Sequence, residues 1–350
     1  MAVYFCVLAG LIFNGCMYEL NHRTKGAKKC LFFCSNLLLV CISGFRYMVG
    51  TDYGTYMQLY NTYKTQEISL FDQPALCIIA RISLLVYDDY ATWFFIMAAI
   101  TIGFIMAGIY RNGFSFWFSI LLYLFVGCWH ESFNIVKQYA GAAILFFGYK
   151  NIVDGKFLKW FIYCLIAATF HISALFMLPM FFLVKAKRLS VTRTCVLIAL
   201  VIIISLNTDL LFEIMAELKM NSGVTNKDSI LGTRNVKWQR ILVAGAPMIM
   251  TCLFWKKYKV EDSNFAVLFY LSLMNFLIFC FIGGQSVYLS RICVYTNIFN
   301  ILLIPYLVKP FKSTEKMFFI SLILVLYFIF WIYDLMKVPE TFNFYWIFER

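Results

Sequence analysis

The stretch "MFFISLILVLYFIFWIY", residues 317–333, contains no charged residue and is long enough to cross a bilayer as one helix. Similar runs recur along the chain of 350 residues, which is 62% hydrophobic and 14% charged, with a mean hydropathy of +0.78. Average soluble domains carry about 25% charged residues. The sequence therefore predicts an all-α, polytopic transmembrane helical bundle of about 10–12 spans. The clearest spans are expected at about 1–18, 30–45, 91–110, 113–129, 133–150, 193–212, 241–255, 264–282, 292–308 and 317–334.

The chain is expected to form a single membrane domain over residues 1–350, with external loops at 46–90, which contains an interfacial helix, and at 213–240. The first apolar run lacks a basic start and a small-residue cleavage site, so it is expected to remain as a span. Two segments do not fit a simple span. Residues 74–87 are short and carry Arg81, which predicts a re-entrant or interfacial segment. Residues 157–184 are predicted to form a bent pair of short helices.

The distribution of charge supports this topology. The connections that it places on the cytoplasmic side hold 18 Lys and Arg against 5 Asp and Glu, and the other side holds 12 basic and 13 acidic residues. This asymmetry follows the positive-inside rule. The net charge of +12 therefore reflects membrane topology rather than nucleic-acid binding. The cytoplasmic connections are 19–29, 110–112, 149–159, 185–193, 256–262 and 309–316.

The sequence lacks the common motifs of metal and nucleotide sites. Its 12 cysteines include no C-x-x-C pair, and most lie inside apolar runs, where cysteine packs as a small apolar residue. Its three histidines are scattered, and it has neither a phosphate-binding glycine loop nor a G-x-S-x-G motif. We therefore expect no metal and no cofactor.

Ionisable residues gather at the predicted external boundary of the membrane. A charge at membrane depth is costly, so such residues indicate a functional site by default. Cations outnumber carboxylates among them, which favours an anionic ligand such as a diphosphate held at the lipid headgroups. The residues are Arg46, Asp52, Arg81, His130, Glu131, Lys137, Arg234, Arg240 and Arg291, with His171 near the tip of the bent pair.

The segment "HESFNIVKQYAG", residues 130–141, has polar side chains at spacings of three and four. On a helix these side chains would share one face. Asn134 and Gln138 are equally well explained as residues that hold helices together in lipid. The charge of Lys137 instead demands an anionic partner.

The segment "GTDYGTYMQLYNTY", residues 50–63, predicts an interfacial helix capped by Thr51 or Asp52. Its tyrosines would lie on one face, where they suit an anchoring belt as well as a substrate contact. The preceding Arg46 suits phosphate binding, but it also suits a side chain that extends to the interface, as does Arg291. A structural histidine, hydrogen-bonded to a nearby hydroxyl, is the alternative to a catalytic His171.

Four segments resemble the signatures of one protein family. "FRYMVGTDYGTYMQLY" (45–60) resembles the "FR..VGTDY..Y...Y" signature of the EpsG-like branch of the Wzy polysaccharide polymerases. "NIVKQYAGAAILFFGYK" (134–150) is similar to the "N..RQ..A..I" helix of that branch, "ATFHISALFMLP" (168–179) to its "A..FH.SA...LP" element, and "YLSRICVY" (288–295) to its late Arg element. Lys137 stands where the family usually has Arg, which keeps the charge but loses the bidentate fork.

The resemblance implies a GT-C-like, inverting and metal-independent glycosyltransferase in the bacterial plasma membrane, with its active site facing outside. Such an enzyme passes a growing glycan from undecaprenyl diphosphate to a lipid-linked acceptor repeat unit. The product would be a capsule, an exopolysaccharide or an O-antigen.

This chemistry suggests roles for the residues at the external boundary. Arg46, Lys137 and Arg291 are expected to bind the diphosphate, because the leaving group's developing charge needs stabilisation. His171 or Asp52 is expected to take the proton of the acceptor hydroxyl, with Glu131 as a weaker candidate. Further substrate contacts are expected from Tyr53, Tyr56, Asn134, Gln138, Arg234 and Arg240.

The expected partners are an undecaprenyl-diphosphate-linked oligosaccharide, membrane lipid, a flippase and a chain-length regulator, and no nucleic acid. Two other functions suit a polytopic chain. A flippase or other transporter often has internal repeats and helices broken by Gly and Pro, whereas this chain has six prolines and no visible repeat. A membrane O-acyltransferase also places a histidine among apolar helices, but its acyl donor usually comes from the cytoplasm.

Overall fold

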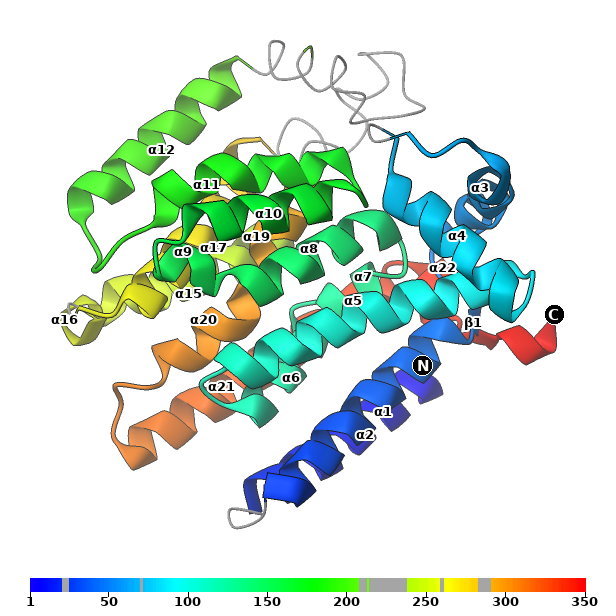
Figure 1. Cartoon of the computed structure of the whole chain (residues 1–350). Coiled ribbons are helices and arrows are strands. Elements are labelled where there is room, and N and C mark those ends of the chain that lie inside the picture. The colour runs from blue at the N-terminus through cyan, green and yellow to red at the C-terminus, as the bar shows by residue number, and fades with distance from the viewer. Residues whose placement is uncertain (21–24, 70–71, 208–212, 214–237, 259–260, 283–290) are drawn as a thin grey trace.

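The computed structural model describes residues 1–20, 25–69, 72–207, 213, 238–258, 261–282 and 291–350 as a bundle of helices (Figure 1). Within these residues, five helices are long and apolar enough to cross a membrane. An α-helix rises about 1.5 Å per residue, so about 20 residues cross the hydrocarbon core. The predicted all-α, polytopic membrane fold is confirmed. The five helices are α1 (Ala2–Leu20), α2 (Lys25–Gly44), α5 (Tyr90–Asn112), α17 (Ser263–Phe281) and α21 (Ser313–Met336).

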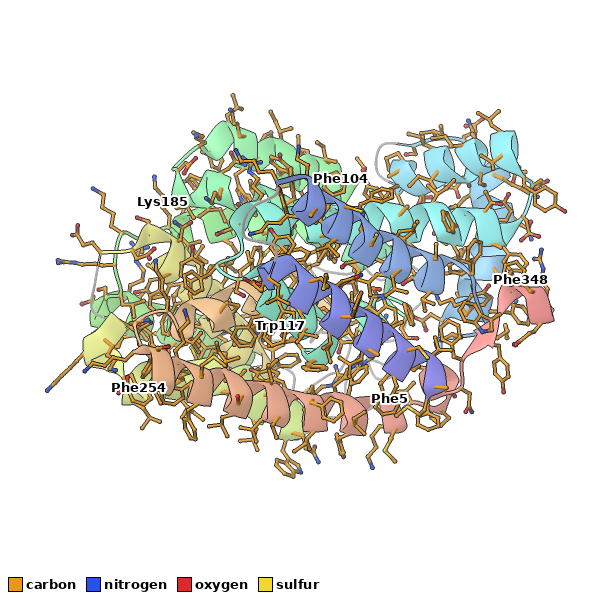
Figure 2. All side chains as sticks on the ribbon, turned by 90° about the horizontal axis from the view of Figure 1, so that it is seen from below. Phe5, Phe104, Trp117, Lys185, Phe254 and Phe348 are labelled. Carbon is orange, nitrogen blue, oxygen red and sulfur yellow. The ribbon has the colours of Figure 1, made fainter. Side chains whose placement is uncertain are left out.

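Shorter helices complete the bundle. Most residues of α8 (Val136–Gly148) and α17 are buried, so these two helices lie inside it. Few residues of α21 are buried, and Figure 2 shows side chains such as Phe5 on the outside of the helices, as lipid contact requires. The other short helices include α6 (Phe116–Phe125), α9 (Lys150–Val153), α12 (Val191–Leu206), α15 (Trp238–Leu253), α16 (Trp255–Tyr258) and α20 (Asn300–Leu307).

The connections that carry the basic residues lie at one end of the bundle. Figure 1 shows the turns α5–α6, α11–α12 and α20–α21 at that end, together with α9, α16, the end of α1 and the start of α2. The opposite end holds both termini, α3 (Tyr53–Thr65), α4 (Pro74–Val86) and α22 (Pro339–Phe342). It also holds an antiparallel pair of short strands, β1 (Arg46–Tyr47) and β2 (Tyr345–Trp346), in which Arg46 is opposite Trp346, followed by the 3-10 helix η3 (Ile347–Glu349).

The bent pair predicted over residues 157–184 is confirmed. It consists of α10 (Phe157–Ala168), a turn at His171, the 3-10 helix η1 (Ile172–Phe176) and α11 (Met177–Val184). The rings of Phe157 and Phe181, at the far ends of the pair, lie 5.2 Å apart. The indole of Trp160 donates to the carbonyl of Met177 at 3.0 Å. The chain therefore returns to the side from which it came.

One prediction about residues 130–141 is wrong. They do not form one helix with a continuous polar face, because α7 (Cys128–Glu131) ends four residues before α8 begins. Gly127, with φ of 93°, separates α7 from α6. His130 and Asn134 therefore do not share a helix face with Lys137.

A second interruption lies next to the first, because α8 and the segment that contains this interruption are in contact. Here the 3-10 helix η2 (Arg291–Cys293) leads into α19 (Val294–Asn297) and then α20. Irregular backbone at membrane depth is tolerated only where it is buried in protein or lines a water-filled cavity. We therefore expect a cavity beside the two interruptions.

Candidate active site

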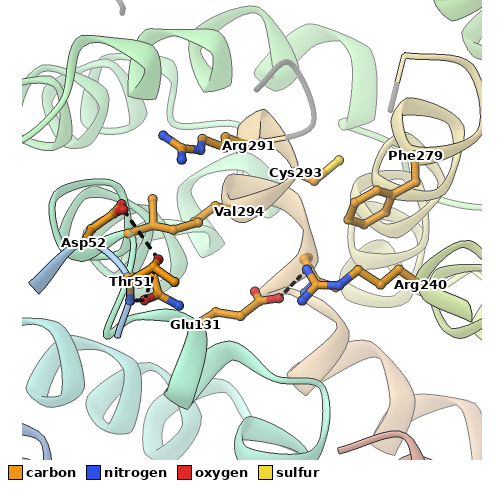
Figure 3. A pocket seen from close by; sticks show the side chains of 11 residues that line it. Thr51, Asp52, Glu131, Arg240, Phe279, Arg291, Cys293 and Val294 are labelled. Carbon is orange, nitrogen blue, oxygen red and sulfur yellow. Dashed lines mark hydrogen bonds and ion pairs between the residues drawn. The ribbon is translucent and has the colours of Figure 1, made fainter. Parts of the chain in front are cut away.

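A cavity of about 190 Å³ lies between the two interruptions. The loop before α3 contributes to one side of it, and η2 with α19 contributes to the other (Figure 3). The lining combines charged side chains with apolar ones. It is formed by Thr51, Asp52, Glu131, Asn134, Ile135, Arg240, Phe279, Arg291, Cys293, Val294 and Asn297.

The loop before α3 is held by Asn134. The side-chain oxygen of Asn134 accepts from the Thr51 amide at 2.6 Å and from the Thr51 hydroxyl at 3.2 Å. The preceding residue must be glycine, because Gly50 has φ of 105° and an added Cβ would lie 2.7 Å from that oxygen. The predicted side-chain cap is wrong, since Asp52 precedes α3 without capping it. Its carboxylate instead lines the cavity.

Two cations and His171 interact electrostatically. Arg291 starts η2 and lines the cavity. Lys137, the second residue of α8, is half-buried, with its ammonium 6.0 Å from the centre of the Tyr56 ring. The charge of Lys137 interacts with Asp72, Asp52 and Arg291. The positive charges of both cations also disfavour a positive charge on His171. The three predicted residues thus belong to one electrostatic group, although the cavity lining includes only Arg291.

A network of ion pairs closes one end of the cavity. Arg240 pairs with Glu131 at 2.7 Å and donates to both oxygens of Asp334, at 3.0 and 3.1 Å. His130 Nε2 lies 3.0 Å from the same Asp334 carboxylate. The hydroxyl of Tyr139 donates to the second oxygen of Glu131 at 2.7 Å. Both Glu131 oxygens therefore have partners, which makes Glu131 poorly placed to accept another proton.

Sequence reasoning missed Asp334. Its side chain is only 11% exposed, and through Arg240 it joins α21 to α7 and α15. The sequence feature that could have indicated it is the position of this acidic residue directly after the uncharged run 317–333. A charge at that position indicates an interior partner.

The side chain of His171 is held in a chain of hydroxyl groups. Its Nδ1 lies 2.6 Å from the Ser173 hydroxyl, which lies 2.8 Å from the hydroxyl of Tyr295. The amide of Gln138 donates to the same Ser173 oxygen at 3.5 Å. Gln138, predicted to contact substrate, thus has a protein partner.

Arg46 lies outside the cavity lining, enclosed by aromatic rings. Its guanidinium carbon is 4.8 Å from the ring centre of Phe94 and 4.9 Å from that of Phe133, and its Nη1 donates to the carbonyl of Ser43. Burial lowers the pKa of Arg46 to about 10, so the side chain stays charged at neutral pH. Cation–π contacts with the surrounding rings stabilise this buried positive charge.

The two tyrosines predicted to contact substrate are also packed inside the protein. Tyr53 stacks on Phe94, with ring centres 4.4 Å apart, and donates to the carbonyl of Arg46. Tyr56 is buried on the same face of α3. The predicted tyrosine face therefore faces the bundle. Arg234 and most of the predicted loop 213–240 lie outside the described residues.

The model of one protein family, described as the EpsG family, matches residues 29–347. The match includes every residue of the cavity lining. No curated protein and no solved structure matches the chain.

Proposed function

We propose a reaction for this chain from one premise: the chain belongs to the EpsG family, a family of Wzy-like polymerases. The family indicates a glycosyltransferase-like polysaccharide polymerase. We infer that this polymerase transfers a glycan from undecaprenyl diphosphate to the sugar end of a lipid-linked repeat unit. The reaction would take place on the outer face of the bacterial plasma membrane.

One observation carries the proposal: a cavity in a membrane protein brings the cation Arg291 together with the carboxylate Asp52. Glycosyl transfer from a diphosphate needs both types of group. A cation stabilises the charge that develops on the leaving diphosphate, and a base accepts the proton of the acceptor hydroxyl. Lys137 adds a second positive charge, which interacts with that of Arg291.

In the proposed step, the acceptor hydroxyl attacks the anomeric carbon from the face opposite the diphosphate. The new C–O bond forms as the bond to the diphosphate oxygen breaks, and the anomeric configuration inverts. The diphosphate leaves with the electron pair and is stabilised by Arg291 and Lys137. The hydroxyl proton passes to Asp52. In this proposal, the two cations stabilise the charge of the leaving diphosphate, a role that a metal ion has in some other glycosyltransferases.

We assign the other predicted residues to supporting roles. Arg46, with its aromatic enclosure, is proposed to hold the backbone that leads into the Thr51–Asp52 loop. Asn134 holds that loop directly. Glu131 and Arg240 are proposed to contact sugar hydroxyls, because their pair lines the end of the cavity. A flippase that supplies the substrate and a chain-length regulator are the proposed protein partners.

The proposal predicts that Arg291→Ala abolishes chain growth. The wild-type protein in lipid vesicles should convert a labelled undecaprenyl-diphosphate-linked repeat unit into a ladder of longer glycans on a gel. Loss of one group that stabilises developing charge lowers the rate by about 10² to 10³. We therefore expect Arg291→Ala to leave only single repeat units, with a normal amount of protein in the membrane.

The matched control is Arg81→Ala. Arg81 is an exposed arginine on α4 that donates to the carbonyl of Gln66 and does not line the cavity. This variant should keep the full ladder. A normal ladder from Arg291→Ala would contradict the site. Movement of the labelled lipid across the vesicle membrane without any lengthening of the glycan would instead identify a flippase.

A further inference from the structure

The turn between α10 and η1 fixes the proton of a histidine. His171 precedes η1, and its side chain caps this 3-10 helix by accepting from the backbone amide of Ser173. The amide nitrogen lies 3.3 Å from Nδ1 of the imidazole. A backbone N–H can only donate a hydrogen bond. Nδ1 must therefore carry a lone pair and no proton.

The neighbouring hydroxyl groups agree with this direction. With Nδ1 as an acceptor, the Ser173 hydroxyl, 2.6 Å away, donates to it. The Ser173 oxygen then accepts from the hydroxyl of Tyr295 at 2.8 Å and from the amide of Gln138 at 3.5 Å. Each group donates to the next one, and the chain ends on the imidazole. A neutral imidazole has one N–H, so the proton of His171 lies on Nε2.

Burial, and after it the surrounding charges, favour the neutral form of His171. Lys137 and Arg291 both act on His171, and a third positive charge beside them would be repelled. Within the described part of the chain, Nε2 has no hydrogen-bond partner from the protein, and His171 is not fully buried. The Nε2–H group is therefore available to a ligand.

We propose that His171 serves the bound substrate as a neutral hydrogen-bond donor, through Nε2–H, to an oxygen of the diphosphate. This proposal rests on the polymerase function and assigns the histidine a role other than general base. Ser173, Tyr295 and Gln138 are positioning residues that keep the proton on Nε2. A neutral donor adds a third contact to the leaving group without adding a third positive charge. The proton of the acceptor hydroxyl is then left to Asp52.

The first test reads the proton directly and needs no activity. The chain has three histidines, so ¹⁵N-histidine NMR of the purified protein in nanodiscs can identify His171 by the signal lost in His171→Gln. We expect an unprotonated Nδ1 and a protonated Nε2. Addition of undecaprenyl diphosphate should shift the Nε2 signal. A proton on Nδ1, or an Nε2 signal unchanged at saturating ligand, would overturn the proposal.

The second test compares two amide variants in the polymerisation assay. Glutamine can place its N–H near the position of Nε2, whereas asparagine places its oxygen near Nδ1 and so keeps only the cap. We expect His171→Gln to stay within about tenfold of wild type and His171→Asn to lose about 10²-fold or more, as for loss of one donor to a leaving group. Neither side chain can accept a proton, so a general base would make both equally inactive. Equal loss in two variants that are folded normally would overturn the proposal.

The two tests separate this inference from the function on which it rests. If the Nε2 signal responds to undecaprenyl diphosphate but the wild-type protein never lengthens a glycan, the donor assignment stands and the polymerase proposal fails. If the wild-type protein lengthens the glycan but the signal does not respond, the polymerase stands and the donor assignment fails.

Discussion

Two arginines at the same boundary have different environments. Arg46 is enclosed by Phe94 and Phe133, whereas Arg291 lines the cavity. In the sequence both lie next to an expected span, Arg46 directly after 30–45 and Arg291 directly before 292–308, and both suit either phosphate binding or an anchoring role. What separates them is the position of aromatic rings from α5 and from the α7–α8 turn. Those contacts join residues far apart in the chain, so the local sequence does not reveal them.

The ion network around Asp334 predicts a stability effect at a single residue. Asp334→Asn keeps the size of the side chain but removes the charge that faces Arg240. Hydrogen bonds to charged groups contribute about 1.5–3 kcal/mol, so we expect the free energy of unfolding to fall by about that amount. Thermal unfolding of the purified protein in detergent would measure it. The matched control is Asp88→Asn, because Asp88 is 56% exposed in its pair with Lys64. Exposed pairs contribute about 0–1 kcal/mol, and an equal shift in both variants would contradict a buried network.

At the scale of elements, the sequence predicted the bent pair α10–α11 but not the break between α7 and α8. The bent pair was predictable because residues 157–184 are too long for one span and too short for two. The break was missed because polar residues at 130–141 recur at helical spacing. Their side chains instead bond to three different partners: His130 to Asp334, Glu131 to Arg240 and Asn134 to Thr51. Tertiary contacts overrode the local pattern.

The loop before α3 gives a prediction at this scale. Gly50→Ala would force a Cβ to within 2.7 Å of the Asn134 oxygen at a φ of 105°, which L residues rarely adopt. Such strain costs about 1–3 kcal/mol and would displace Thr51 and Asp52. We expect the rate of polymer synthesis in vesicles to fall at least tenfold, which corresponds to an increase of about 1.4 kcal/mol or more in the activation free energy.

A second glycine close by provides the control for this variant. Gly54 lies in α3, and a Cβ added there would meet no atom within 4 Å. Gly54→Ala should therefore keep full activity and add slightly to stability, since alanine is favoured over glycine in a helix by about 1 kcal/mol. Activity unchanged in Gly50→Ala would show that the loop does not position Asp52.

At the scale of the molecule, the fold class followed from composition, and the separation of the two ends followed from charge. The apolar runs predicted a membrane bundle, and the basic connections do lie together at one end (Figure 1). The cavity itself was not predictable, because it forms where two interruptions, at residues 132–135 and 291–299, meet. Its position depends on how helices distant in sequence pack.

The last prediction concerns which end of the bundle faces outside. Glu67, shortly after α3, and Lys187, between α11 and α12, are both exposed, and α3 and the α11–α12 turn lie at opposite ends of the bundle (Figure 1). In a variant without its native cysteines, a cysteine at 67 should react with a membrane-impermeant maleimide added to intact cells. A cysteine at 187 should react only after the cells are opened, because it lies beside Lys185 and Arg188 in a basic connection, which the positive-inside rule assigns to the cytoplasm. The reverse labelling would place Arg291 and Asp52 at the cytoplasmic end. Polymerisation on the outer face would then be impossible in this cavity, even though the fold itself would be unchanged.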